Sequence, residues 1–191
     1  AARTAYPDWI ATADMVLYSK QRARSGELVA VGSVVRAGRG SVVIEAEILA
    51  KPRQSEAATS IGSAIAAFTR LRSREDTVQT SRDNASHQVF TLEGHSTSQD
   101  ILDKAGLRVL DEAAGAVEVE MSDYVRNAFH GIHGGMFGLL ADVAGQSAAR
   151  AVARRPLITS DLSIHYLSMG KVGPFYTKTR IERATEDSVV T

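Results

Sequence analysis

The sequence has 191 residues, of which 44% are hydrophobic and 23% charged, a composition typical of a globular protein with one sizeable core or two small ones. Lysine plus arginine and aspartate plus glutamate number 22 each, so no overall field would attract nucleic acid or an anionic membrane surface. The absence of cysteine excludes disulfides, thiolate metal sites and a cysteine nucleophile.

Targeting signals are also missing from the sequence. No apolar run approaches the roughly 18 residues that a membrane-spanning helix needs, and the N-terminus lacks the basic and apolar regions of a signal peptide. We therefore expect a cytoplasmic protein that has neither a membrane nor a nucleic acid as its partner.

The first part of the chain alternates like a set of strands. A turn at Arg24-Ser25-Gly26 and a hairpin turn at Gly38-Arg39-Gly40 interrupt the alternation. We predict strands at residues 10–18, 27–36, 41–50 and 57–69. From Arg70 to Thr97 the sequence is polar and charged with little periodicity, which indicates a connection between domains.

The next stretch begins with a short helix. Its pattern predicts a capped helix that starts near Ser98 and ends near Gly106. Residues 107–121 then alternate between apolar and acidic side chains, which predicts one long strand. In that strand Val117, Val119 and Met121 share one face, and Glu118 and Glu120 share the other.

A long helix is predicted from Gly134 to about Arg154. The segment is led by glycine, apolar and rich in alanine, and Arg154-Arg155-Pro156 brings it to an end. Strands at residues 157–168 and 174–183 follow. The order of a strand, a glycine-rich turn, a long helix of small residues and antiparallel strands is expected where a sheet wraps one central helix.

Two distant segments of the chain resemble each other. Thr12-Ala13-Asp14 and Thr159-Ser160-Asp161 both begin a strand-like stretch, and they lie 147 residues apart. The same offset, without a gap, pairs Gly26 with Gly173 and makes eleven of the 44 overlapping positions identical. One unbroken register favours a duplicated unit over chance similarity between two valine-rich hairpins.

The offset also predicts how the chain is divided. It aligns Ala1 with the middle of the long helix and Thr191 with the middle of a strand pair. We therefore predict that residues 1–70 are the later part of repeat one, residues 71–106 a linker with the short helix, and residues 107–191 the earlier part of repeat two. The missing parts belong to a longer tandem protein, or the fragments complete one another in an assembly.

The segment from Asn127 to Asp142 carries a recognisable motif. It combines the asparagine and Gly131 with a His-Gly-Gly triplet at 133–135 and a Leu-Ala-Asp triplet at 140–142. This spacing resembles the signature of the phenylacetate-type branch of hot-dog acyl-CoA thioesterases, in the 4-hydroxybenzoyl-CoA thioesterase-like superfamily. The resemblance implies an α+β hot-dog fold, with an antiparallel sheet wrapped around a long central helix. The internal repeat extends this resemblance to a tandem (double hot-dog) arrangement, in which both repeats are incomplete.

The paired glycines of the motif suit an oxyanion site. Gly134 and Gly135 let a substrate carbonyl approach the backbone closely, and the N–H groups of a helix's first turn present positive partial charge. Gly134 N–H is a candidate donor to the oxyanion that develops during thioester hydrolysis, and Gly135 a candidate substrate contact. The alternative is a simple turn at a helix start.

Asp142 is the candidate catalytic carboxylate. It lies between Ala141 and Val143 in an otherwise apolar helix, where an ordinary solvated aspartate would be out of place. The resemblance implies a general base or nucleophile towards the thioester carbonyl. The alternative is a structural aspartate satisfied by backbone, by Arg126 or by Arg150.

Further polar residues of the motif have implied roles. The resemblance makes Asn127 and His133 partners that orient the loop, the thioester or the attacking water, although His133 alone would more often be structural. Thr159 occupies the strand position near the thioester, with Ser160 as the fallback. His130 and His133 have no third ligand at a supporting spacing, so we expect no metal and no cofactor.

Helix geometry predicts a site shared between two helices. Eight residues separate Gly134 from Asp142, which is about 12 Å along a helix, whereas donor and base must both lie within roughly 3–4 Å of one carbonyl. Each residue therefore works with a second helix. That helix comes from the missing part of repeat one or from another subunit, so we expect a homo-oligomer with sites at interfaces between hot-dog units.

The leading hypothesis is hydrolysis of acyl-CoA thioesters to free acid and coenzyme A. A hot-dog module that only binds acyl-CoA is the main alternative, but it has no need of Asp142. A hot-dog dehydratase or hydratase would place its histidine and acid differently. Repeat one could also serve only to support repeat two.

Overall fold

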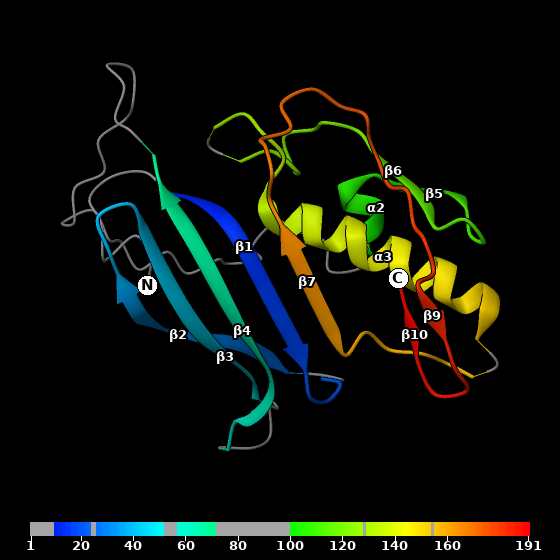
Figure 1. The fold of residues 1–191 in the computed structure, drawn as a ribbon, viewed down its shortest axis with the longest axis horizontal. Helices are drawn as coiled ribbons and strands as arrows, with labels where there is room; N and C mark the ends of the chain where they lie inside the picture. Colours follow the sequence, from blue (N-terminus) through cyan, green and yellow to red (C-terminus); the bar gives the residue numbers. More distant parts are fainter. Residues whose placement is uncertain (1–9, 24–25, 52–56, 72–99, 128, 154) are drawn as a thin grey trace. The chain divides into compact units, whose positions relative to one another are not determined.

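The computed structural model describes residues 10–23, 26–51, 57–71, 100–127, 129–153 and 155–191. The turn expected at 24–26 and most of the linker expected over 71–106 lie outside the described residues. The chain forms two compact units (Figure 1). Unit 1 comprises Ala1–Val89 and Ser160–Leu167, and unit 2 comprises Phe90–Thr159 and Ser168–Thr191.

Unit 1 is an antiparallel five-stranded sheet with the order β2-β3-β4-β1-β7. Its strands are β1 (Ile10–Ser19), β2 (Glu27–Ala37), β3 (Ser41–Lys51), β4 (Thr59–Arg70) and β7 (Asp161–His165). The first four match the strands expected from the alternation of the sequence. The small core of this sheet is formed by Val42 and Ile44 of β3, against which Ile10 and Phe68 pack.

The pairing of β1 with β7 has a register that agrees with the sequence repeat. Val16 lies opposite Ser163, its own counterpart at an offset of 147 residues. On either side, Asp14 lies opposite His165 and Tyr18 lies opposite Asp161. A local two-fold axis through the Val16–Ser163 pair would produce this register.

Two hairpins agree with the repeat in the same way. In unit 1, Arg36 pairs with Val43 and Ala37 with Val42, and Gly38 N donates to Ser41 O at 2.8 Å. In unit 2, β9 (Arg183–Ala184) and β10 (Val189–Val190) form pairs displaced from these by 147 residues, and Thr185 N donates to Ser188 O at 2.8 Å. The matching turns support a duplication, which remains a prediction.

Unit 2 begins with the short helix α2 (Ile101–Ala105). Asp100 caps its N-terminus by accepting from Leu102 N at 2.8 Å, and Gly106 ends it in the left-handed conformation. The end expected near Gly106 is therefore confirmed, whereas the start expected near Ser98 lies outside the described residues.

The long strand expected over residues 107–121 is wrong. The structure has a hairpin of β5 (Leu107–Asp111) and β6 (Ala116–Val119), which continues into a three-stranded sheet with β8 (Phe175–Tyr176). The turn requires Gly115, which has a φ of +56° and approaches the helix so closely that a Cβ would lie 2.5 Å from Ala144 O. Asp111 also accepts from Ala114 N at 3.0 Å, which tightens the turn.

Other strands are shorter than expected. The strand expected over 157–168 is confined to β7, and the one expected over 174–183 is divided between β8 and β9. In β6 the expected faces hold, because Val117 and Val119 are buried. Glu118, on the opposite face, is also buried because it lies between Arg108 and Tyr176 on the neighbouring strands.

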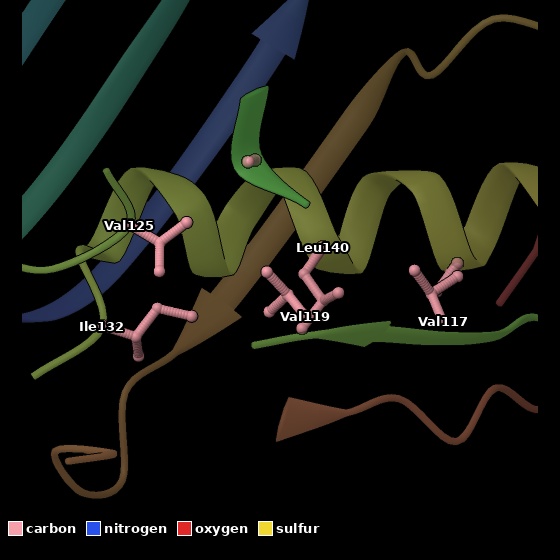
Figure 2. Close-up of a cluster of buried hydrophobic side chains, with 7 residues drawn as sticks. Val117, Val119, Val125, Ile132 and Leu140 are labelled. Carbon is pink, nitrogen blue, oxygen red and sulfur yellow. The ribbon is translucent and has the colours of Figure 1, made fainter. Parts of the chain in front are cut away.

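The long helix α3 (Gly134–Val152) carries the core of unit 2. Its start is as expected, and it ends at Val152, with Ala153 as the C-cap and Arg150 in the last turn, where the helix dipole favours a cation. Figure 2 shows Leu140 beside Val119 of β6, with Val117 further along the same strand. The buried cluster consists of Ala105, Val117, Val119, Val125, Ile132, Leu140 and Ala144. The small residue at 144 lets the helix approach the sheet closely.

Antiparallel sheets with a helix place the chain in the α+β class and are compatible with a hot-dog fold. In the part of the chain that the structure describes, no helix is long and apolar enough to cross a membrane.

Candidate active site

Asn127 organises the loop that leads into α3. Its side-chain oxygen accepts from Phe129 N at 2.8 Å and from Gly131 N at 3.1 Å, and its amide donates to Ile132 O at 3.2 Å. Its backbone N–H donates to Gly131 O at 2.7 Å. These hydrogen bonds of Asn127 therefore hold the loop in a tight conformation. One residue inside this loop, His130, has a φ of +60°, a conformation that the surrounding hydrogen bonds hold.

The same loop is fixed to two neighbouring segments. His133 N donates to Val125 O at 2.8 Å, and Ile132 N donates to Gly170 O at 2.9 Å. Gly131 lies so close to the second segment that a Cβ would be 2.5 Å from Cγ of Met169. A larger residue at 131 would displace the loop before the helix begins.

His133 is the N-cap of α3. Its Nδ1 accepts from Gly135 N at 3.0 Å, which satisfies one N–H of the first turn. Because Nδ1 accepts, the neutral ring carries its proton on Nε2. The first turn contains no acidic residue, so its positive partial charge is not offset by a carboxylate of its own. This helix start is suited to a negative charge on a substrate.

Asp142 lies two turns further along α3 and is half-buried. Thr159, just before β7, donates from its hydroxyl to Oδ1 at 2.5 Å. Gln146, one turn further along the helix, donates from Nε2 to Oδ2 at 2.8 Å. Both carboxylate oxygens thus accept a hydrogen bond, and the two donors belong to different segments of unit 2.

The cations considered as partners of Asp142 have other contacts. Arg126 forms an ion pair with Asp123 at 3.2 Å, and Arg150 donates to the Gln146 oxygen at 3.2 Å. Among the described residues, neither arginine forms an ion pair with Asp142. The donors to Asp142, Thr159 and Gln146, are both neutral.

The candidate residues fall into two groups. Asn127, His133, Gly134 and Gly135 lie at the helix start, whereas Asp142 and Thr159 lie together in its middle. Eight residues of helix separate the groups by about 12 Å. The sequence suggested Thr159 with Ser160 as fallback, and Thr159 is the residue whose hydroxyl contacts Asp142; the Ser160 carbonyl accepts from Ser19 N at 2.8 Å.

Sequence reasoning missed Gln146. The available signal was its position four residues after Asp142 and four before Arg150, the spacing at which helical side chains meet. His130 and His133, considered as a metal pair, belong to no group of three or more potential ligands within the described residues.

A family model matches part of the chain. Residues 129–191 match the model of the thioesterase superfamily. This match confirms the resemblance to hot-dog thioesterases over that region, which includes His133, Gly134, Gly135, Asp142 and Thr159, whereas Asn127 lies two residues before it. No curated protein matches the chain.

Proposed function

We propose that the protein, whose residues 129–191 match the thioesterase superfamily, hydrolyses acyl-CoA thioesters to the free acid and coenzyme A. The observation that carries the proposal is the carboxylate of Asp142. It is half-buried in an apolar helix and held on both oxygens, by Thr159 and Gln146. A module that only bound acyl-CoA would have no need to hold a carboxylate in this way.

In this proposal Asp142 is the general base or the nucleophile. As a base it takes a proton from water, which attacks the thioester carbonyl. As a nucleophile it attacks that carbonyl directly and forms a mixed anhydride, which water then hydrolyses to the free acid and the regenerated carboxylate. Either route places negative charge on the carbonyl oxygen and releases the thiolate of coenzyme A. Thr159 supports both routes by fixing Oδ1, and its hydroxyl also adjoins the substrate's position.

The oxyanion is assigned to the start of α3. Gly134 N–H is the proposed donor, and Gly135 leaves room for the thioester beside the backbone. The absence of an acidic residue from the first turn supports this assignment, because the helix dipole there favours an anion.

Asn127 and His133 act on this site by holding its backbone. The hydrogen bonds of Asn127 go to its own loop, and His133 Nδ1 binds Gly135 N–H. Both residues therefore set the position of the first turn of α3. His133 is an exposed residue, and Nε2 is the ring nitrogen that the hydrogen bond with Gly135 N–H does not use.

A complete site needs a second helix in this proposal. Since Gly134 and Asp142 are about 12 Å apart along α3, the donor facing Asp142 comes from another helix start. A homo-oligomer or a duplicated hot-dog unit would supply it. The two hairpins of equal register and the two-fold register of β1 and β7 support the duplicated arrangement.

Hydrolysis of a panel of acyl-CoAs, followed by thiol release, tests the proposed activity. We expect Asp142→Asn to bind substrate, because volume and hydrogen bonding are nearly retained, but to lower kcat by about 10² or more. The control is Asp103→Asn, an exposed aspartate of α2, which should retain the parent rate. Parental turnover in Asp142→Asn would make the residue structural, whereas binding of acyl-CoAs by the parent without any thiol release would favour a binding module.

Subunit mixing tests where the site is completed. A variant with a bulky residue at Gly134 and the variant Asp142→Ala are each expected to be inactive. If identical chains share the site, mixing them should restore part of the activity, because one hybrid site then has an intact donor and an intact carboxylate. No recovery despite proven subunit exchange would assign the donor to the same chain.

A further inference from the structure

The carboxylate of Asp142 is held by a row of side chains along one face of α3. Asp142, Gln146 and Arg150 are spaced four residues apart, so they lie one above another on the helix. Gln146 Nε2 lies 2.8 Å from Oδ2 of Asp142, and Arg150 Nη2 lies 3.2 Å from Oε1 of Gln146. The row ends at a carboxylate that the proposed reaction uses.

Arg150 determines which end of the Gln146 amide meets Asp142. A guanidinium only donates hydrogen bonds, so the amide oxygen must face Arg150. The amide nitrogen is then turned toward Asp142, where it donates to an oxygen that only accepts. With Arg150 exposed and Gln146 half-buried, the arginine fixes the orientation from the solvent side.

The two donors of Asp142 act on different oxygens from different directions. Thr159 reaches Oδ1 from the segment before β7, and Gln146 reaches Oδ2 from the next turn of the helix. With Thr159 as the only donor, the carboxylate would keep some freedom to turn about its Cβ–Cγ bond. A second donor on the other oxygen restricts that rotation, and among the described residues these two donors use two of the four lone-pair positions of the carboxylate.

We infer that Gln146 is a positioning residue for Asp142, with its amide orientation set by Arg150. This inference rests on the proposed function, because it assigns a role toward the carboxylate of that reaction. Gln146 acts through Asp142, which it holds in the plane that the reaction requires. A deviation of a fraction of an ångström or roughly 10–20° in such a group is enough to lower turnover.

A purely structural role makes a different prediction. Side-chain pairs four residues apart stabilise a helix by about 0.2–0.5 kcal/mol and have no effect on chemistry. A residue that binds substrate would raise KM when it is removed. A positioning residue lowers kcat at nearly constant KM and constant stability, so the three roles can be distinguished by measurement.

The main experiment uses Gln146→Met. Methionine has a similar length and helix propensity but cannot donate to Asp142. We expect kcat to fall about tenfold, in the range that misplacement of a reacting group produces, while KM and the unfolding transition change little. A kcat within about twofold of the parent, or a loss that appears in KM alone, would overturn the inference.

A double-mutant cycle tests whether Gln146 acts through Asp142. In the Asp142→Asn background, Gln146→Met should cause no further loss, because the group that it positions is already disabled. If the losses in kcat were additive, the inference would be wrong even if Gln146→Met alone lowered kcat. The cycle also separates the two proposals, because parental turnover in Asp142→Asn alone would reject the proposed function whatever Gln146 does.

Arg150 provides a graded version of the same test. Arg150→Met removes the group that selects the amide orientation, so the amide can turn its oxygen toward Asp142 for part of the time. We expect kcat to fall about two- to threefold, and Arg150→Lys, which still donates, to recover most of it. If Arg150→Met and the parent had equal kcat, Arg150 would not set the amide orientation. The result for Gln146→Met would then decide whether Gln146 positions Asp142.

Discussion

The two units of the molecule hold their structure by different means. Unit 1 is made of strands of up to 12 residues joined in a regular antiparallel ladder, whereas the strands of unit 2 have at most five residues. On β2 of unit 1, Leu28 is 67% exposed, whereas Val117 of β6 in unit 2 is fully buried. Backbone hydrogen bonds thus dominate the first unit, and side-chain burial against α3 dominates the second.

This difference explains where an active site can be built. The loop around Asn127 that leads into α3 has irregular backbone, which is not part of a regular strand ladder. Buried neighbours hold it instead, since Val125 and Ile132 of this loop belong to the core of unit 2. All of the candidate catalytic residues lie in that unit. The comparison predicts that equivalent changes in the two units have unequal effects.

The largest difference is expected for truncation of a leucine. Leu140→Ala removes a side chain that is 3% exposed in the core of unit 2, and it should lower the free energy of unfolding by about 2–4 kcal/mol. Leu28→Ala removes a 67% exposed side chain of β2 and should change it by less than about 0.5 kcal/mol. Urea unfolding of the two variants measures both values. Equal losses of unfolding free energy in the two variants would mean that the burial of the truncated leucine does not determine the loss.

A smaller difference is expected for glycines in two hairpin turns. Gly115→Ala adds a Cβ at a φ of +56° and against Ala144 O, so it should lower the stability of unit 2 by about 1–3 kcal/mol. At Gly40, in the turn between β2 and β3, a Cβ meets nothing within 4 Å, and Gly40→Ala should be neutral or slightly stabilising. Thermal unfolding measures both. A Gly115→Ala variant as stable as Gly40→Ala would contradict the close approach of hairpin and helix.

The smallest effect concerns acid stability. The hydroxyl of Tyr176 and the guanidinium of Arg108 favour the charged carboxylate, and they hold the pKa of Glu118 below its usual value although burial raises it. A depressed pKa gives stability that is present above the unfolded pKa and is lost as pH falls through the folded pKa. Tyr176→Phe should therefore move the acid unfolding midpoint of unit 2 to higher pH.

The control for this effect lies in unit 1. Tyr18→Phe changes a half-exposed tyrosine of β1 and should leave the acid midpoint in place. Circular dichroism between neutral pH and about pH 3 follows both variants across the range where carboxylates titrate. An unchanged midpoint in Tyr176→Phe would show that the tyrosine does not stabilise the charged form of Glu118.

The sequence predicted most of the fold because its local signals agree. Alternating residues and glycine turns specified β1 to β4, and the cap residues specified α2 and the limits of α3. The strand expected over 107–121 failed because Gly115 interrupts an otherwise alternating stretch with a turn that the helix packing requires. Periodicity carries no information about a close approach between two elements.

The site was predictable where it is local and unpredictable where it depends on tertiary contact. The spacing from Asn127 to Asp142 singled out Asn127, His133 and Asp142, whose catalytic roles stay a prediction, but it did not indicate that His133 caps α3. The contact of Thr159 with Asp142 joins residues 17 apart in sequence, and the resemblance indicated only that Thr159 lies near the thioester. The role of Gln146 required the position of the Asp142 carboxylate, which no spacing rule supplies.

The register of β1 and β7 has a consequence for how the two repeats could diverge. Under the proposed duplication, Asp14 and Asp161 are counterparts, but one lies opposite His165 and the other opposite Tyr18. In a homodimer one codon encodes both symmetric positions, so every substitution appears twice. In a tandem chain two codons encode them, and each aspartate can acquire its own neighbour: Asp14 contacts Nδ1 of His165, and Asp161 has a tyrosine across the strand. Under this proposal, joining the two repeats in one chain would allow the two symmetric positions to have different contacts.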